Sequence, residues 1–521
     1  MKGFVFLKWF RVILSLINFL FIFFIFIDFA NTFSSALING VLFFQFVPSI
    51  LKFINLLTFS AAGFILIFLL TIFFGRVYCS SFCPLGTLQD IISFFSRKIR
   101  KKKLYKKTRA YNLLQYAILA LVVIFILFGS ILLVNLLDPY SNFGKIVSNI
   151  FRPVYYSINN VGVYFLEKFG IYSMYRVEAK AYNFYSMGFS MAFMGLVGFL
   201  SYKHGRLYCN TVCPVGTLLG LTSKFSLFKI QLNDSLCTSC GVCGANCKSG
   251  CIDTQAKTVD FSRCVGCFNC LTVCPSNGVT FQSSFKKPEE VVPIEKKVNN
   301  RRKFFADTAV MSVGVLSLTN KVFGEEIKEG MVPVVKEYPV TPPGSQSIEH
   351  FNNFCTACHL CVSACPTHVL QPSVTEYGLM GLFQPRMDYM ASFCNFECVI
   401  CSEICPTGAI KLINLEEKKT IQLGKTNFIK ENCVVYTDET ACGACSEHCP
   451  TKAVNMVFYK DKLTIPEITQ EICVGCGACE YACPTTPKSI YVDGNPIHQV
   501  AEKPKEEESL KEVDPEEDFP F

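Results

Sequence analysis

The chain has 521 residues, of which 51% are hydrophobic and 29 are cysteines, and its net charge is +8. Its length allows two or three domains, and the apolar excess lies almost wholly in the first 220 residues, which hold only four of the cysteines. Most of the other cysteines stand in Cys-x-x-Cys runs, which suit metal centres better than a disulfide scaffold. Because the basic residues cluster beside apolar segments, membrane topology explains them better than nucleic-acid binding does.

Four apolar segments approach or exceed the ~20 residues that a helix needs to cross a bilayer. They are 12–29, 53–74, 113–137 and 184–202. A fifth apolar segment, 36–51, directly precedes the second of these. We expect it to lie in the membrane interface or to form a re-entrant segment.

The distribution of lysine and arginine predicts the orientation of these spans. Residues 97–109 contain nine basic residues, whereas the 45 residues of 138–182 contain five. By the positive-inside rule the N-terminus and the 75–110 loop are expected in the cytoplasm, and the 138–182 loop outside. Four spans then return the chain to the cytoplasm near residue 203.

An internal repeat is the most specific feature of this half. GRVYCSSFCPLGTL at 75–88 is followed by GRLYCNTVCPVGTL at 205–218. The four cysteines of the repeat are Cys79, Cys83, Cys209 and Cys213. Each pair follows a span that returns to the cytoplasm, so we expect all four at one membrane depth, where they could hold an iron–sulfur cluster or another soft metal. The alternative is two redox-active or unligated thiol pairs. No histidine lies inside a span, which argues against a transmembrane b-type haem.

Two ferredoxin-like runs come next, CTSCGVCGANC at 237–247 and CVGCFNCLTVCP at 264–275. In such a run the first three cysteines bind one [4Fe–4S] cluster and the fourth binds the other. One predicted ligand set is Cys237, Cys240, Cys243 and Cys274, and the other is Cys264, Cys267, Cys270 and Cys247. Zinc is a poorer explanation of two such runs in succession.

Cys251 is left over from these two sets, and Lys248 stands where a proline usually follows the fourth cysteine. Cys251 is either a spare buried thiol, which we favour, or the ligand in place of Cys247. This domain follows the fourth span, so we expect it in the cytoplasm.

A Lys/Glu/Pro-rich linker leads to Arg301-Arg302, Phe304-Phe305 and a mildly apolar stretch. This pattern is similar to an internal twin-arginine export signal, a route that carries folded domains. The alternative is a basic pair on a solvated linker followed by a short helix. If the stretch crosses the membrane as a fifth span, the C-terminal domain is periplasmic.

Four further runs occupy 355–366, 394–406, 433–450 and 473–484, and pairing them in order predicts four more clusters. The predicted sets are Cys355, Cys358, Cys361 and Cys405; Cys394, Cys398, Cys401 and Cys365; Cys433, Cys442, Cys445 and Cys483; and Cys473, Cys476, Cys479 and Cys449. The second and third runs are irregular after their first cysteine. His359 completes a c-type haem motif, but the ferredoxin register continues through it, so we interpret it as incidental.

The predicted fold class is a membrane α-helical protein, with four spans and a fifth crossing, that carries α+β ferredoxin-like domains. The expected organisation is a transmembrane domain at 1–225, a two-cluster domain at 226–285, a linker with the export signal and fifth span at 286–347, a four-cluster domain at 348–495 and an acidic, disordered tail at 496–521.

Residues 1–285 resemble the NapH-type membrane quinol dehydrogenases, through the four spans, the two Cys-x3-Cys-Pro motifs and the two-cluster ferredoxin. Residues 300–490 resemble the NapG/MauM-type periplasmic polyferredoxins. The resemblance implies a protein of the bacterial inner membrane that oxidises menaquinol or ubiquinol. It also implies that the electrons reach a periplasmic reductase or cytochrome. The cysteine spacing predicts six [4Fe–4S] clusters for this route, and the repeat could add a seventh metal centre.

No nucleotide-binding glycine motif and no covalent-flavin motif is found, so a lipid-soluble quinol is the expected donor. The sequence assigns no quinone-site residue: Asp138 could accept a quinol proton, but a helix boundary at Asp138-Pro139 explains it better. Two alternatives stay open. One is a copper reductase similar to the accessory ferredoxins of cytochrome oxidase assembly, and the other is a non-enzymatic electron conduit.

Overall fold

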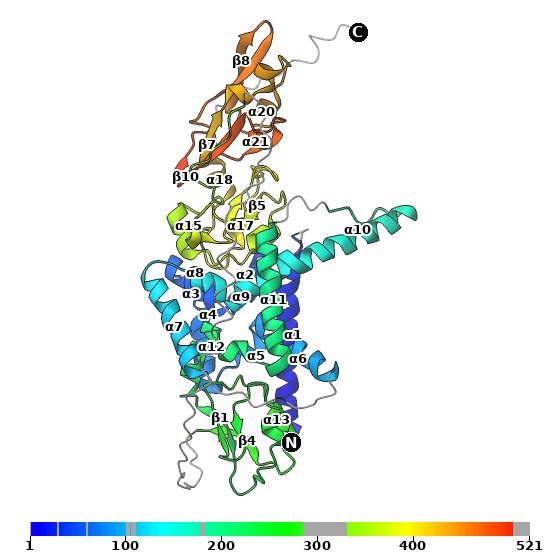
Figure 1. The fold of residues 1–521 in the computed structure, drawn as a ribbon, viewed down its shortest axis with the longest axis vertical. Coiled ribbons are helices and arrows are strands. Elements are labelled where there is room, and N and C mark those ends of the chain that lie inside the picture. Colours follow the sequence, from blue (N-terminus) through cyan, green and yellow to red (C-terminus); the bar gives the residue numbers. More distant parts are fainter. Residues whose placement is uncertain are drawn as a thin grey trace, which may run out of the picture.

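The computed structural model describes residues 2–28, 31–58, 61–99, 105, 111–177, 183–284 and 331–503. The predicted twin-arginine segment, the fifth crossing and most of the acidic tail lie outside these residues. The molecule is elongated and has three parts (Figure 1). A helical domain (2–225) lies in the middle, the first ferredoxin domain (226–284) at one end and the second ferredoxin domain (331–503) at the other.

Two helices of the described chain are long and apolar enough to cross a membrane, α1 (Lys2–Ile27) and α11 (Phe184–His204). Both run along the long axis of the molecule (Figure 1). Helices α2 (Ser35–Leu42) and α3 (Phe46–Leu56) meet at an angle of 107°, which is the geometry of a broken span or a re-entrant loop. This bend falls within the segment expected to be interfacial or re-entrant.

The other two predicted spans are not continuous helices. The expected span 53–74 is divided between the end of α3 and α4 (Gly63–Phe74), and Leu57 takes a left-handed backbone with φ 50°. The expected span 113–137 is divided into α7 (Asn112–Leu127) and α8 (Leu132–Leu137). Gly129 stands at this second break with φ 74°, a conformation that glycine adopts without strain. Hydrophobicity alone does not reveal either break.

The segment predicted as the external loop is largely helical. It forms α9 (Pro139–Ile146), a π-helix η2 (Val147–Phe151) and α10 (Arg152–Lys168). Asp138 caps α9, because its carboxylate accepts hydrogen bonds from the backbone N–H and the hydroxyl of Ser141. The helix boundary expected at Asp138-Pro139 is therefore present. Helix α10 projects sideways from the molecule (Figure 1).

Each copy of the internal repeat forms a short helical turn followed by a longer helix. The first copy gives α5 (Tyr78–Ser81) and α6 (Pro84–Ile99), and the second gives the 3-10 helix η3 (Tyr208–Asn210) and α12 (Pro214–Ser223). Proline begins α6 and α12, which suits the first position of a helix. The two copies therefore share local structure as well as sequence.

The first ferredoxin domain has two antiparallel strand pairs and two short helices. Strand β1 (Phe228–Leu232) pairs with β4 (Val279–Ser283), and β2 (Ile252–Asp253) pairs with β3 (Thr258–Val259). The helices are α13 (Val242–Ala245) and α14 (Asn269–Val273).

The second ferredoxin domain is also built from antiparallel strand pairs and short helices. Its strand pairs are β5 (Leu370–Pro372) with β6 (Pro385–Met387), β7 (Ile421–Phe428) with β10 (Ile490–Val500), and β8 (Val454–Lys460) with β9 (Leu463–Ile468). Its helices are α15 (Ile348–Phe354), α16 (Leu360–Ala364), α17 (Ile400–Glu403), α18 (Leu415–Thr420), α19 (Val434–Thr437), α20 (Ala444–Glu447) and α21 (Ala478–Ala482), with 3-10 turns η4 (Leu379–Gly381) and η5 (Lys430–Asn432).

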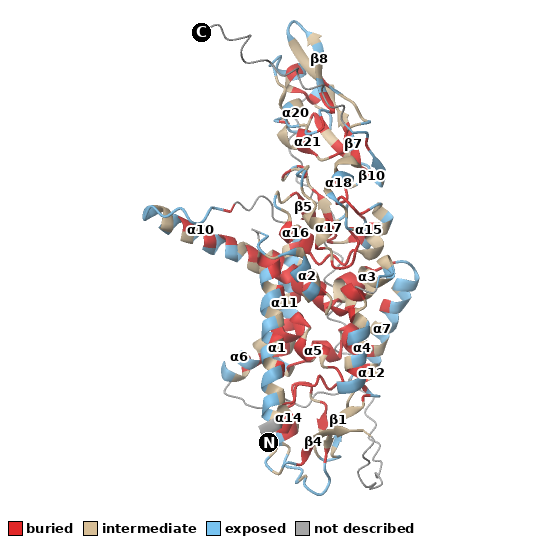
Figure 2. Ribbon diagram, turned by 180° about the vertical axis from the view of Figure 1, so that it is seen from behind, coloured by how far each residue is buried: buried red, intermediate tan, exposed pale blue. Residues whose placement is uncertain are grey.

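The second ferredoxin domain packs on the end of the helical domain that lies away from the first. Polar side chains of the helical domain hold its loops: Asn55, Asn135 and Arg152 donate to the carbonyls of Gly408, Leu382 and Ser363. Buried residues concentrate inside the helical domain and along its junctions with both ferredoxin domains, whereas outward faces of α1, α7 and α11 are exposed (Figure 2). Those outward faces are apolar, as a lipid-facing surface requires.

Candidate iron–sulfur centres

The described residues bring together each of the six predicted ligand sets. In four of the sets, the thiols lie close enough together for three of them to affect the pKa of the remaining one. Burial has the largest effect and raises that pKa, and the three neighbouring thiols raise it further. The four groups are Cys243 with Cys274, Cys237 and Cys240; Cys361 with Cys355, Cys358 and Cys405; Cys445 with Cys442, Cys483 and Cys433; and Cys479 with Cys476, Cys473 and Cys449.

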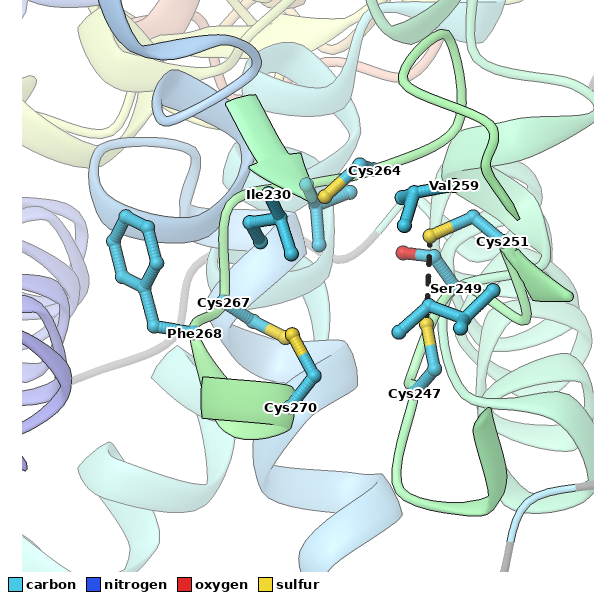
Figure 3. A pocket seen from close by; sticks show the side chains of 11 residues that line it. Ile230, Cys247, Ser249, Cys251, Val259, Cys264, Cys267, Phe268 and Cys270 are labelled. Atoms are coloured by element: carbon cyan, nitrogen blue, oxygen red, sulfur yellow. Dashed lines mark hydrogen bonds between the residues drawn. The ribbon is translucent and has the colours of Figure 1, made fainter. Parts of the chain in front are cut away.

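The other two sets line pockets. One pocket is lined by Cys365, Cys394, Cys398 and Cys401. The other pocket is lined by Cys247, Cys264, Cys267 and Cys270, together with Cys251 (Figure 3). The thiols are the ligand type that iron–sulfur clusters use, and most are buried, so the residues of all six sets fit [4Fe–4S] clusters.

A left-handed residue before the third cysteine turns the regular runs around their sites. Gly241, Phe268, His359 and Gly477 have φ between 58° and 79°, and each begins the short helix that carries the third cysteine. The corresponding residues of the two irregular runs, Val399 and Gly443, have negative φ. The irregular spacing seen in the sequence therefore coincides with a different local backbone.

His359, the histidine of the haem-like motif, is buried and occupied by a structural contact. Its Nε2 atom lies 3.0 Å from the carbonyl oxygen of Phe383. The flanking cysteines Cys355 and Cys358 group with Cys361, in the ferredoxin arrangement.

The four cysteines of the internal repeat converge in the middle of the helical domain. All four are buried, and they belong to one hydrophobic core. Cys83 and Cys213 stand just before α6 and α12, and the backbone N–H groups of Gly86 and Gly216 each lie 3.4 Å from the respective sulfur. Such N–H groups stabilise thiolates and the clusters that thiolates bind.

The repeat copies exchange arginines. Arg206 of the second copy donates to the carbonyl oxygen of Cys79 in the first at 2.6 Å, and Arg76 of the first donates to the carbonyl oxygen of Cys209 in the second at 3.0 Å. Their guanidinium groups also lie 3.9 Å (Arg76) from the sulfur of Cys79 and 4.0 Å (Arg206) from that of Cys209.

Glycines make room for this exchange. A Cβ atom at Gly86 would lie 2.5 Å from a nitrogen of Arg206, and one at Gly216 would lie 2.8 Å from a nitrogen of Arg76. The carbonyl oxygens of Cys79 and Cys209 lie closer still, at 2.4 and 2.3 Å, so both the backbone and the arginine of the other copy leave no room for a side chain at these two positions.

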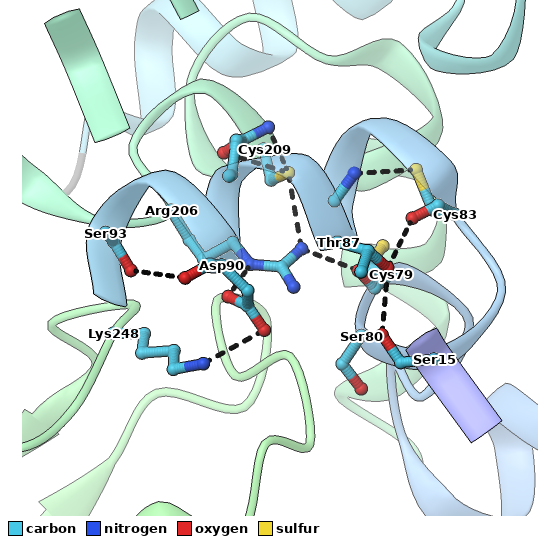
Figure 4. Close-up of polar contacts among 12 residues, drawn as sticks. Ser15, Cys79, Ser80, Cys83, Thr87, Asp90, Ser93, Arg206, Cys209 and Lys248 are labelled. Carbon is cyan, nitrogen blue, oxygen red and sulfur yellow. Dashed lines mark hydrogen bonds and ion pairs between the residues drawn. The ribbon is translucent and has the colours of Figure 1, made fainter. Parts of the chain in front are cut away.

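Asp90 of α6 gathers the basic residues around this site (Figure 4). Its carboxylate pairs with Arg206 at 2.8 Å, with Lys248 at 2.9 Å and with Arg11 at 3.5 Å. Burial alone would raise the pKa of Asp90, but Arg206, Lys248 and Arg11 outweigh burial and hold the pKa well below its usual range. Asp90 is therefore a charged anchor, and it joins the first ferredoxin domain to the helical domain through Lys248.

The charges around the four cysteines do not balance without an anion. Arg76 is fully buried, and its recorded partners within the described chain are neutral oxygens of Asn210, Ser262 and Cys209 together with the sulfur of Cys79. An isolated buried charge costs far more than it returns. Thiolates that hold a metal cluster would supply the missing negative charge, so the four cysteines fit such a centre.

Contacts link the cysteine groups into one series along the molecule. In the first ferredoxin domain, Cys243 of the outer set is close enough to Cys270 of the inner set to affect its pKa. The inner set then meets the helical domain: Gly266 packs on Val77, two residues before Cys79, and the backbone N–H of Arg206 donates to the carbonyl of Lys248 at 3.0 Å.

The series continues into the second ferredoxin domain. Cys358 lies in the same hydrophobic core as the four repeat cysteines, and a Cβ atom at Gly144 of α9 would lie 2.3 Å from its carbonyl oxygen. Cys361 neighbours Cys401, the N–H of Cys394 donates to the carbonyl of Cys476 at 3.0 Å, and Cys479 neighbours Cys445.

Sequence reasoning missed the charged residues of this site. Arg76 and Arg206 occur at the same place in both repeat copies, GRVYC and GRLYC, so the repeat itself carried a signal for them. Asp90 and Lys248 have no such signal. At the spacing of the repeat, the residue of the second copy that aligns with Asp90 is Gly220, which carries no acid, and Lys248 lies outside both copies.

Comparisons with known proteins define the class. A model described as a 4Fe–4S binding domain matches residues 56–102 and 186–233, one match on each copy of the repeat. A 4Fe–4S dicluster domain matches residues 440–486, and a further 4Fe–4S binding domain matches residues 348–371. The chain therefore contains 4Fe–4S binding domains of the ferredoxin type, a kind of domain that transfers electrons.

The chain is similar in sequence to two named ferredoxin-type proteins. The chain is similar to the ferredoxin-type protein NapH of Haemophilus influenzae, with 22% identity over 44% of this chain and 69% of that protein. It is similar to the ferredoxin-type protein NapG of Escherichia coli, with 28% identity over 27% of this chain and 58% of that protein. The resemblance to NapH-type and NapG-type proteins is thereby confirmed.

A third relative, the uncharacterized protein MJ0749 of Methanocaldococcus jannaschii, is 33% identical over 19% of this chain and 40% of that protein. The chain thus spans less than two thirds of the length of MJ0749 and of NapG. No solved structure matches the chain.

Proposed function

We propose that the protein is a quinol-oxidising, membrane-bound electron-transfer protein. It oxidises menaquinol or ubiquinol to the quinone and conducts the two electrons, one at a time, to a periplasmic reductase or cytochrome. The observation that carries this proposal is the unbroken series of cysteine groups from one end of the molecule to the other, with the four repeat cysteines at its centre. The similarity to NapH supports quinol as the donor.

Six [4Fe–4S] clusters and a seventh centre at Cys79, Cys83, Cys209 and Cys213 are part of the proposal. When bound, these groups supply one-electron redox chemistry. The chain supplies the rest: short cysteine loops that hold each group, backbone N–H groups directed at sulfur, and the buried cations Arg76 and Arg206 at the central site. The apolar core around the central cysteines excludes water from it.

The orientation proposed from the basic loop agrees with the shape of the molecule. The first ferredoxin domain, which follows α11 and its basic end, is proposed to lie in the cytoplasm, and the second in the periplasm. Its support is that the second ferredoxin domain packs on segment 138–152, which the positive-inside rule assigns to the outer face.

A second candidate function is favoured by one feature of the series. The first ferredoxin domain extends beyond the helical domain on the side away from the second, and a donor in the membrane would not need it. A conduit fed by a soluble cytoplasmic donor would use both ends.

One experiment separates these functions. The full chain, purified anaerobically in detergent, is mixed with a menaquinol analogue while electron paramagnetic resonance follows cluster reduction. Quinol oxidation predicts reduction in the native protein and its loss in Cys209→Ala/Cys213→Ala, whose remaining clusters still respond to dithionite. If dithionite reduces the clusters of the native protein and the quinol reduces none, the quinol proposal is wrong and the conduit stands.

A further inference from the structure

Cys251 lies against a predicted cluster site that already has its four cysteines. Its sulfur is buried and 3.4 Å from the sulfur of Cys247 (Figure 3), and Cys264 lines the same pocket. Both of these residues belong to one predicted ligand set, and all five sulfur-bearing residues line the same pocket. Cys251 is thus part of the site rather than a thiol packed elsewhere in the core.

The other runs show what normally occupies this position. The residue four places after the fourth cysteine is Gly278, Val369, Ala409, Ala453 or Pro487, all without a metal-binding group. Where it is Ala453, its backbone N–H lies 3.2 Å from the sulfur of Cys449. In that run the position thus lies against the fourth ligand, and among the six runs only the one with Cys251 has a thiol there.

The backbone between the two thiols also differs from the other runs. Proline follows the fourth cysteine in five runs, as Pro275, Pro366, Pro406, Pro450 and Pro484, whereas Lys248 follows Cys247. The side chain of Lys248 pairs with Asp90, and its carbonyl accepts the N–H of Arg206. The segment that bears both thiols is consequently anchored to the helical domain.

We propose that Cys247 and Cys251 are alternative fourth ligands of the cluster held by Cys264, Cys267 and Cys270. In the exchange, the bond from iron to the Cys247 sulfur breaks and a bond from the same iron to the Cys251 sulfur forms. The proton of the Cys251 thiol moves to the Cys247 thiolate, so no oxidant or reductant is required. This inference rests on the proposed cluster at this site.

The test compares alanine variants of the full chain in detergent, purified anaerobically, by iron content and electron paramagnetic resonance. Cys251→Ala and Cys247→Ala should each retain the cluster, the second with altered spectral parameters. Cys247→Ala/Cys251→Ala should lose it. Cys267→Ala is the matched control, because every other thiol on its own loop is already a predicted ligand, and it should lose the cluster as well.

Loss of the cluster from Cys247→Ala as complete as that from Cys267→Ala would overturn the inference. The inference would also be overturned if Cys251→Ala accumulates in the membrane and Cys247→Ala does not, because Cys251 then cannot replace Cys247. These outcomes differ from failure of the proposed cluster assignment, in which the native protein and Cys251→Ala would already lack this cluster, and from failure of quinol oxidation, which leaves the iron content of every variant unchanged.

Discussion

Asp90 is the carboxylate on which three buried cations depend. Arg11, Arg206 and Lys248 come from α1, the second repeat copy and the first ferredoxin domain, so one side chain joins three segments distant in sequence. Removing one partner of a buried ion pair leaves the others uncompensated.

We therefore expect Asp90→Asn to lower the free energy of unfolding by about 3 to 5 kcal/mol. Thermal or denaturant unfolding in detergent measures this loss. Glu416→Gln is the control, because it breaks an exposed ion pair with Lys419 that is worth at most about 1 kcal/mol. Equal stability of the two variants would contradict the anchoring role of Asp90.

Lys145 is a further buried basic side chain, next to the first cysteine loop of the second ferredoxin domain. Its ammonium group donates to both oxygens of Asn135 and lies over the rings of Phe189 and Phe383. The preceding residue, Gly144, touches the Cys358 carbonyl. A positive charge beside a cluster stabilises its reduced, more negative form.

Lys145→Met should consequently lower the midpoint potential of the proposed cluster that Cys358 helps to bind, whereas Lys145→Arg should preserve that potential. A redox titration followed by electron paramagnetic resonance gives both values, and Lys425→Met, at an exposed position of β7, is the control. Unchanged potentials in Lys145→Met would show that this charge does not act on the cluster.

Residues with a repeated spacing were the easiest to predict. The predicted ligand sets rest on Cys-x2-Cys-x2-Cys-x3-Cys, which four of the six runs keep, because that spacing is local and the chain must turn around one group. Lys145 and Asp90 were not foreseen, since their partners lie in other segments and only the tertiary structure brings those segments together.

At the scale of elements, the two repeat copies interlock through their arginines and glycines. A Cβ atom at Gly216 would lie 2.3 Å from the carbonyl oxygen of Cys209 and 2.8 Å from Arg76. The Cys209 carbonyl is part of the backbone and cannot rotate away as a flexible side chain can. An added methyl group at residue 216 must therefore displace the loop that carries Cys209.

We expect Gly216→Ala to destabilise the protein by about 1 to 3 kcal/mol and to reduce its iron content. Gly195→Ala is a matched control within α11, where no atom lies within 4 Å of the added Cβ, and alanine favours the helix by up to ~1 kcal/mol. Thermal unfolding and iron analysis compare the two. If Gly216→Ala matches Gly195→Ala in both, the interlocked packing is wrong.

Hydrophobicity located the apolar segments but did not predict where their helices break. The apolar segments were found, but 53–74 and 113–137 contain breaks at Leu57 and Gly129 that an apolar average conceals. The segment 138–182 was expected to be only a connecting loop. Its helix α9 is amphipathic rather than continuously apolar, and part of α9 is buried by the second ferredoxin domain, a contact that the local sequence does not reveal.

At the scale of the whole molecule, the sequence left the route between the ferredoxin domains open. The arrangement of domains supplies one: the four repeat cysteines lie between the inner set of the first ferredoxin domain and Cys358 of the second, within continuous packing. Linear order in the chain could not reveal this, since the second ferredoxin domain follows a linker whose course lies outside the described residues.

We propose that electrons pass between the two ferredoxin domains, and so across the membrane, through the four repeat cysteines. The direct measurement uses liposomes that contain the full chain and enclose ferricyanide, with dithionite added outside; both insertion directions then report transfer as bleaching of ferricyanide. The native protein should bleach it, and Cys79→Ala/Cys209→Ala should bleach it no faster than protein-free liposomes do. Equal rates for the native protein and this variant, with the other clusters intact in both, would contradict the claim.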